Sequence, residues 1–267
     1  MPAGTTLSAR IETPAFVLRS HALGESDRIV VLLTREAGKL RGVAPHAAAS
    51  RRRFGGALSV LAEVQLSWRE RRGSDLGRVE ACELLTPTPG EGRDLDAFYA
   101  ASYLAEVLEQ FAREGQPDAA LYRLTRACST ALAAGMNARA VARYFEVWTL
   151  RLGGLLADLE ACAGCGRSLD TGAVVAAGGE ARCLRCRATG RVVTGDRMRL
   201  SAPVMTLVRR ILAQPPAAAL AEARDGEIDA LGRASSHWLR QFAERPFRTA
   251  NHLAAPGPAG LARERRP

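Results

Sequence analysis

Four cysteines in two closely spaced pairs constrain this chain more than any other feature of its sequence. Cys162 and Cys165 form one CxxC pair, Cys183 and Cys186 form a second, and 17 residues separate the pairs. This spacing is typical of a zinc site with four thiolate ligands, because each CxxC turn can bring two sulfur atoms to one ion. Four thiolates complete the tetrahedron and leave no open position. The pattern therefore predicts one structural Zn²⁺ per chain.

Other uses of these cysteines fit the sequence less well. Disulfides need an oxidising compartment, and the first 20 residues lack the basic start and apolar run of an export signal. A redox CxxC needs only one pair, whereas an iron–sulfur cluster is compatible with the ligand type. Cys82 and Cys128 lie in apolar patterns, so we expect both to be buried, inert thiols.

Composition limits the class of protein. The 267 residues are 47% hydrophobic and 24% charged, which suits two globular domains and is too apolar for a disordered chain. No stretch approaches 18 uninterrupted apolar residues, so we expect no membrane-spanning helix and a cytoplasmic location. The net charge of +9 divides into +4 over 1–86, −3 over 87–160 and +8 over 161–267. A basic surplus of this size suits a nucleic acid or an anionic membrane as partner.

The first 86 residues are patterned as short strands. Apolar residues alternate with polar ones over 58–68, with Glu63 among the polar positions, Trp68 on the inward side and only Leu61 breaking the order. Such alternation predicts a half-buried strand. Further strands are expected at 15–20, 28–34, 39–44 and 78–85, separated by glycine-containing turns. Five strands fit the OB-fold barrel, and an SH3-like barrel has similar spacing.

A basic loop interrupts these strands at 45–57. It carries Arg51, Arg52 and Arg53 in succession, followed by Phe54 and two glycines. Guanidinium groups can bind phosphates bidentately, while a like-charge run can also be simply a solvated surface loop. A second run of basic residues surrounds and follows the second cysteine pair. Its members are Arg182, Arg185, Arg187, Arg191, Arg197 and Arg199.

From Asp94 onward the apolar period becomes helical. One stripe joins the residues Leu95, Phe98, Ala101, Ala105, Leu108 and Phe111. A second helix is expected from Pro117 to Gly135, and Asn137 can cap a third. Beyond the cysteines, helices are expected over 201–212 and 226–244, the latter with Trp238 and Phe242 facing inward. No phosphate-binding P-loop, HExxH or GxSxG motif is present, so we expect a protein without enzymatic activity.

The order of these parts resembles a known family. The run FVLRSHALGESDRIVVLLTREAGKLRGVA followed by SRRRFGGAL, then DAFYAASYLAEVLEQF, then YFEVWTLRLGGLLADLEACAGCG, is similar to the RecO family of bacterial recombination mediators. The resemblance covers roughly residues 12–250 in the right order, which makes it more specific than any single motif.

This resemblance implies an α+β multidomain protein, an N-terminal OB-fold β-barrel followed by an all-helical domain with an inserted zinc finger of four cysteines. The expected bounds are 1–86 for the barrel, 87–160 and 191–250 for the helical domain, 161–190 for the finger and 251–267 for a disordered tail.

The resemblance also implies binding of single- and double-stranded DNA, annealing of complementary strands and help in loading a recombinase at the nucleoid. The implied protein partners are the RecR ring and the tail of single-stranded-DNA-binding protein. The predicted DNA-binding residues are Arg35, Lys39, Arg41, Arg51, Arg52 and Arg53. A zinc-ribbon nuclease and an RNA-binding OB-fold protein are the alternatives.

Overall fold

The structure is a computed structural model that describes residues 10–47, 50, 54, 56–71, 73–90, 94–176, 179–188 and 197–253. The side chains of 187, 188 and 197 are outside this description. The contacts divide the chain into two compact units, Met1–Ser129 and Thr130–Pro267, and each is considered by itself. Within the described ranges, no helix is both long enough and apolar enough to cross a membrane.

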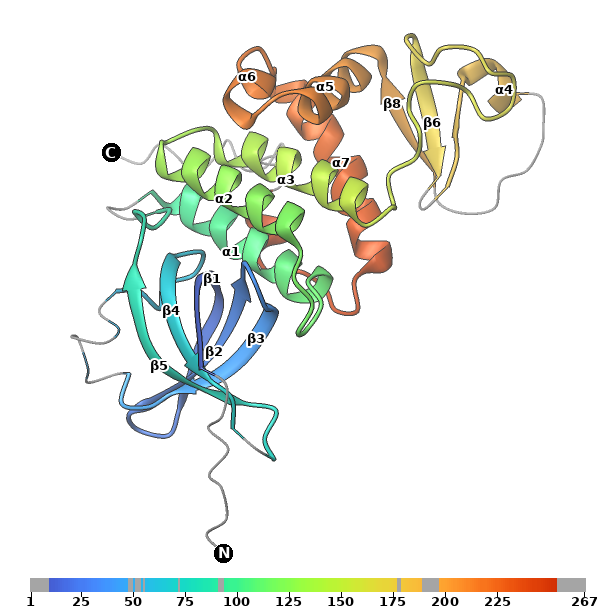
Figure 1. Ribbon diagram of the computed structural model, residues 1–267. Coiled ribbons are helices and arrows are strands. Elements are labelled where there is room, and N and C mark those ends of the chain that lie inside the picture. The colour runs from blue at the N-terminus through green and yellow to red at the C-terminus, as the bar shows by residue number, and fades with distance from the viewer. Residues whose placement is uncertain are drawn as a thin grey trace, which may run out of the picture. The chain divides into compact units, whose positions relative to one another are not determined.

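Unit 1 contains a closed five-stranded barrel (Figure 1). Its strands are β1 (Arg10–Leu23), β2 (Asp27–Thr34), β3 (Gly38–Ala44), β4 (Glu63–Arg69) and β5 (Gly77–Leu84). They close in the order β1-β2-β3-β5-β4, with β3 and β5 parallel and every other pair antiparallel. The predicted OB-like barrel is confirmed, with all five strands near their expected places.

The strand expected over 58–68 begins only at Glu63. Leu61, which breaks the alternation, is buried and has a φ of +59°, a conformation that ends regular pairing. Its N–H donates to the carbonyl of Val17 (2.7 Å), and the N–H of Val17 donates to the carbonyl of Ala62 (3.0 Å). These bonds join the turn to β1 beside an irregularity in the β1–β2 register. The alternation before Glu63 therefore belongs to a buried turn.

The barrel core depends on close packing around one indole ring. Trp68 lies on the inward side of β4 and is buried, as predicted. A Cβ atom on Gly77 of the adjacent strand would lie 2.1 Å from the Trp68 ring. Only glycine therefore leaves room for the tryptophan at this crossing.

Two helices follow the barrel in sequence: α1 (Leu95–Phe111) and α2 (Ala119–Ala133). The Asp94 carboxylate caps α1 by accepting from the N–H of Ala97 (3.0 Å). The predicted apolar stripe of α1 is wrong at its start, because Leu95 is 65% exposed and Phe98 is also exposed. The buried face instead joins Ala97, Ala100, Ala101, Tyr103, Leu104, Ala105, Val107 and Leu108. Both stripes have helical spacing, and packing against β1 and β2 selects the second.

Unit 2 contains the helices α3 (Ala138–Leu152), α5 (Ala202–Ala213), α6 (Pro216–Leu220) and α7 (Asp225–Phe242) and the 3₁₀ turn η1 (Ala250–Leu253). The predicted cap of α3 is confirmed, since Asn137 Oδ1 accepts from the N–H of Ala140 (3.0 Å). Trp238 is buried as expected. Phe242 was expected to face inward, but it is exposed because α7 ends at this residue. Most of the tail expected over 251–267 lies outside the described residues.

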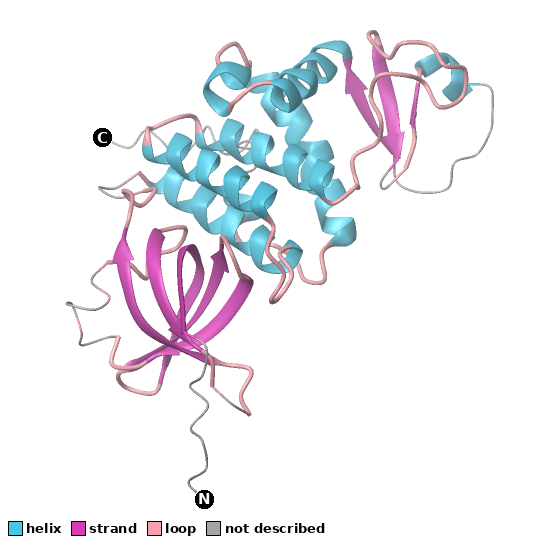
Figure 2. Cartoon of the chain, viewed as in Figure 1, coloured by secondary structure: helices cyan, strands magenta, loops and turns pink. Residues whose placement is uncertain are grey.

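A small sheet module lies between α3 and α5 in the sequence (Figure 2). It consists of β6 (Gly172–Ala176), β7 (Ala181–Arg182), the short helix α4 (Leu184–Ala188) and β8 (Arg197–Ser201), with strand order β7-β6-β8. β6 and β7 pair antiparallel between the two cysteine pairs of the sequence. The third strand, β8, lies beyond residue 190 and precedes the helix expected from 201.

Candidate functional site

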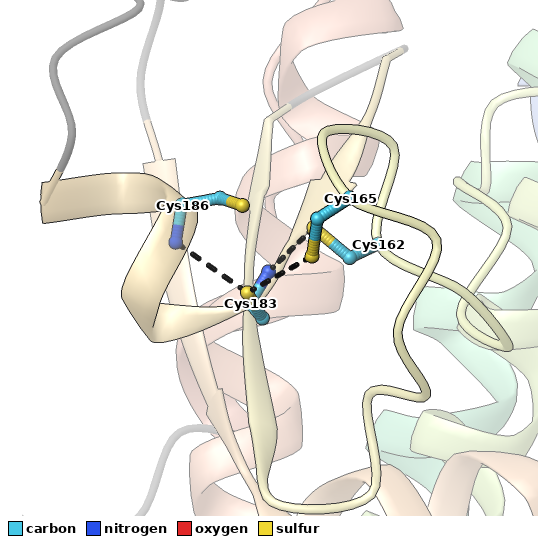
Figure 3. Close-up of side chains that lie close together, drawn as sticks. All are labelled: Cys162, Cys165, Cys183 and Cys186. Carbon is cyan, nitrogen blue, oxygen red and sulfur yellow. Dashed lines mark hydrogen bonds between the residues drawn. The ribbon is translucent and has the colours of Figure 1, made fainter.

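The four cysteines of the two CxxC pairs meet in unit 2 (Figure 3). Cys162 and Cys165 lie in the turns that precede β6, Cys183 directly follows β7, and Cys186 lies in α4. Their sulfur atoms all lie within 4.8 Å of one another, and the Cys165 and Cys183 sulfurs are 3.9 Å apart. A tetrahedral zinc ion with bonds near 2.3 Å places its sulfur ligands about 3.8 Å apart. The cluster thus has the size of a zinc site.

Backbone N–H groups favour the thiolate form at Cys162 and Cys183. Hydrogen bonding with Cys165 and the other neighbouring cysteines instead raises the pKa of Cys186 to about 12. The Cys162 sulfur accepts from the N–H of Cys183 (3.2 Å) and of Gly164 (3.4 Å), and the Cys183 sulfur accepts from the N–H of Cys186 (3.4 Å). Burial raises the pKa of the Cys162 thiol, but the N–H donors outweigh it and bring the pKa to about 6. Since zinc binds the deprotonated sulfur, this donor set fits the ion.

The backbone near the cluster is compact. A Cβ on Gly164 would lie 3.3 Å from the Cys186 sulfur, so a larger residue there would crowd the site. On the helical side, Arg209 of α5 reaches the segment around the cysteines. Its Nη1 pairs with Asp170 (3.0 Å) and its Nη2 donates to the carbonyl of Leu159 (3.3 Å). The arginine holds the module against α5.

The two other cysteines belong to unit 1. Cys82 and Cys128 are both buried, as expected. Burial raises the pKa of Cys82 to about 12, and burial also raises the pKa of Cys128. Both thiols therefore stay protonated near neutral pH, which suits inert core residues.

Of the predicted DNA-binding residues, Arg51, Arg52 and Arg53 lie outside the described residues. The residues on either side of them are anchored. Ser50 donates its N–H to the carbonyl of His46 (2.9 Å), and the Phe54 ring is part of the barrel core. The described residues on either side of the arginine run thus have a local turn bond at Ser50 and core packing at Phe54.

The other three predicted residues belong to β3 or precede it. Arg35 is half-exposed and pairs with Glu36 (2.8 Å), and Arg41 is half-exposed and pairs with Glu114 (2.6 Å). Lys39 is only 8% exposed, and its Nζ donates to the carbonyl of Glu109 in α1 (2.7 Å). Lys39 thus contributes to packing between β3 and α1, whereas Arg35 and Arg41 lie at the surface.

Exposed arginines outside the predicted set also lie on unit 1. Arg71 follows β4, and Arg78 of β5 stands opposite Arg69 in the β4–β5 ladder. In the basic run around the second cysteine pair, Arg182 pairs with Glu180 (2.7 Å), whereas Arg185 and Arg199 are exposed. Strand alternation could have identified Arg78, because it places this residue on the outer face.

Comparison with known proteins places the whole chain in one family. Residues 8–88 match the family model described as Recombination protein O N terminal, and residues 92–250 match Recombination protein O C terminal. A relative from Koribacter versatilis is 36% identical over 159 residues, which are 60% of this chain and 65% of that protein.

Two further relatives are similar at the same level. A relative from Anaeromyxobacter sp. strain K is 40% identical over 66% of this chain and 70% of its own length. A relative from Geobacter metallireducens is 36% identical over 68% of this chain and 74% of its own length. The matched segment thus spans about two thirds to three quarters of these relatives, all three of which are named DNA repair protein RecO. The two family models and the shared architecture show that this chain belongs to the RecO family of DNA repair proteins.

Proposed function

We propose that this chain binds single- and double-stranded DNA, anneals complementary strands and helps to load a recombinase onto protein-coated single strands. The observation that carries the proposal is the OB-like barrel, in whose sequence Arg51, Arg52 and Arg53 stand between β3 and β4. OB-folds commonly hold single strands in a positively charged groove. The role proposed for the chain is binding and positioning, without a covalent step.

Charge is the main source of affinity in this proposal. The barrel aromatics Phe16, Phe54 and Trp68 are all buried in unit 1, so none of them offers a surface on which a base can stack. The half-exposed Arg35 and Arg41 and the exposed Arg71 and Arg78 add to the arginine run. Contacts of this kind bind phosphates without reading sequence.

We predict that replacing Arg51, Arg52 and Arg53 together by alanine weakens the salt dependence of single-strand binding. Each neutralised phosphate contributes a slope of about −0.7 to the plot of log K against log salt, so the loss of three contacts should flatten it by about 2. Fluorescence anisotropy with a labelled oligothymidylate over a salt series measures this slope. An unchanged slope, with unaltered thermal stability, would show that the loop is only a solvated surface.

We further predict that the protein accelerates duplex formation between complementary single strands without nucleotide. Two phosphate backbones repel each other, so a protein that neutralises both at once lowers the barrier to pairing. The net charges of +4 over 1–86 and +8 over 161–267 provide two basic regions for this task. The rate should rise several-fold over the protein-free reaction at low salt.

The annealing reaction should be followed with strands coated by single-stranded-DNA-binding protein as well as with bare strands. No acceleration by protein that binds both strands would contradict the proposal. Parallel reactions with magnesium test for a nuclease, which would shorten the strands. Competition between matched DNA and RNA strands tests for an RNA-binding protein.

The remaining parts of the proposal concern the zinc ion and the partners. Cys162, Cys165, Cys183 and Cys186 would hold a structural Zn²⁺ that maintains the sheet module. The RecR ring and the tail of single-stranded-DNA-binding protein are the proposed protein partners, at the nucleoid of the cytoplasm. Pull-down of each purified partner by the full chain tests these two contacts.

A further inference from the structure

A pocket in unit 2 is lined by four arginines and one carboxylate. It lies among α3, α7 and η1 and has a volume of about 310 Å³. Its basic residues are Arg139 and Arg143 of α3 and Arg233 and Arg240 of α7, and its acidic residue is Asp229. None of these arginines belongs to the basic runs that are evident in the sequence.

The floor of the pocket is built around a buried arginine. Arg143 is 6% exposed, its Nη1 donates to Ser236 Oγ (3.0 Å), and its Nη2 pairs with Glu146 (3.1 Å). Its Nε has no acceptor among the described residues. A Cβ on Gly232 would lie 2.2 Å from Arg143 Nη1, so glycine in the middle of α7, although unfavourable in a helix, makes room for the guanidinium.

The rim carries positive charge that the protein only partly compensates. Arg139 pairs with Asp229 (2.7 Å) and Asp225 (3.2 Å). Arg233 and Arg240 are exposed, stand seven residues apart on one face of α7, and form no ion pair with any described residue. Two guanidinium groups therefore flank the pocket with their charge unmatched.

We infer that this pocket binds a phosphate group of the nucleic-acid backbone, as a second DNA contact separate from the barrel. The inference rests on the proposed DNA binding and assigns a new site to it. A phosphate accepts hydrogen bonds from guanidinium groups, and Arg233 and Arg240 offer such donors, whereas the Ser236 hydroxyl already donates to Glu146 Oε1 (2.8 Å). Unit 2 then holds one strand while the barrel holds another, as annealing requires.

The chemistry of the lining favours a phosphate over an acidic peptide with an apolar end. Such a peptide needs open apolar surface for its last side chain. The large apolar residues of the lining, Ile228 and Leu253, are each only 4% exposed. The other lining side chains are mainly arginines and polar residues, against which the apolar end of such a peptide could bury little surface.

The test compares two pairs of exposed arginines in the full chain. In Arg233→Ala/Arg240→Ala, the slope of log K against log salt for a labelled oligothymidylate should flatten by about 1.4, the value for two lost phosphates. The control Arg123→Ala/Arg151→Ala removes the same charge from exposed helical positions outside the pocket and should change the slope far less. Thermal melting checks that both variants are folded.

Each outcome bears on the pocket independently of the barrel loop. The inference is overturned if the salt slope of the pocket variant equals that of the control variant. It is also overturned if the pocket variant loses binding of an acidic peptide while its salt slope for DNA is unchanged. If Arg51→Ala/Arg52→Ala/Arg53→Ala leaves the slope unchanged while the pocket variant flattens it, the loop proposal fails and the pocket inference stands.

Discussion

Purified protein is expected to contain one zinc ion per chain, and Cys162→Ser is expected to abolish it. Cys162 is buried and its sulfur accepts two backbone N–H bonds, so a serine there provides a weaker metal ligand at the best-shielded position. Apparent zinc-binding free energies in small fingers are about 10–16 kcal/mol. A loss on this scale should unfold the β6–β7–β8 module, whose other buried residues are mostly small, such as Ala173, Ala176 and Ala181.

Elemental analysis and amide hydrogen exchange of residues 172–201 measure the two parts of this result. The helices α3, α5 and α7 share their own buried residues and should stay protected from exchange. Cys82→Ala and Cys128→Ala serve as controls, because both thiols lie in unit 1 and should leave the zinc content at one ion. Zinc-free protein with a protected module would contradict the prediction.

The second large effect concerns a buried carboxylate in unit 1. Glu63, at the start of β4, is 1% exposed and accepts hydrogen bonds from Tyr122 Oη (2.8 Å), Arg126 Nε (2.9 Å) and Arg126 Nη2 (2.7 Å). Burial and then the neighbouring Glu63 raise the pKa of Tyr122, which keeps its hydroxyl a neutral donor. These contacts tie α2 to the barrel within unit 1.

We expect Arg126→Met to lower the free energy of unfolding by about 3–5 kcal/mol, because it leaves the Glu63 charge buried without its counterion. Glu63→Leu should cost less, about 1–3 kcal/mol, because it leaves the Tyr122 hydroxyl without its acceptor while the Arg126 side chain, 53% exposed, can be rehydrated. Urea denaturation of both variants measures their free energies of unfolding, and Arg126→Met should be the less stable of the two.

The double variant Glu63→Leu/Arg126→Met should recover most of the loss, since replacing both charges by apolar groups removes the buried charge itself. Arg123→Met, an exposed arginine on the same helix, is the matched control and should change stability by less than about 0.5 kcal/mol. An Arg126→Met protein as stable as this control would mean that Glu63 does not need its partner.

Local patterns in the sequence were sufficient for the five barrel strands, the long helices and the cysteine cluster. The alternation around Trp68, the capping residue Asn137 and the spacing of the two CxxC pairs each depend on residues only a few positions apart. Backbone geometry links such neighbours directly, so strand, cap and CxxC turn could be predicted before any packing was known. The five barrel strands and the cysteine cluster agree with those predictions.

Contacts between distant residues decided the rest. Glu63 occupies a polar position of the alternating pattern, yet α2 covers it and supplies its hydrogen-bond partners. Lys39 is buried, and its Nζ donates to a backbone carbonyl 70 positions away in the sequence. Leu95 satisfies helical periodicity as well as Ala97 does, and only packing on the barrel leaves it exposed. Arg143 and Arg233 meet at one pocket because α3 packs on α7. Periodicity determines which residues share a face, whereas burial depends on which surface that face meets.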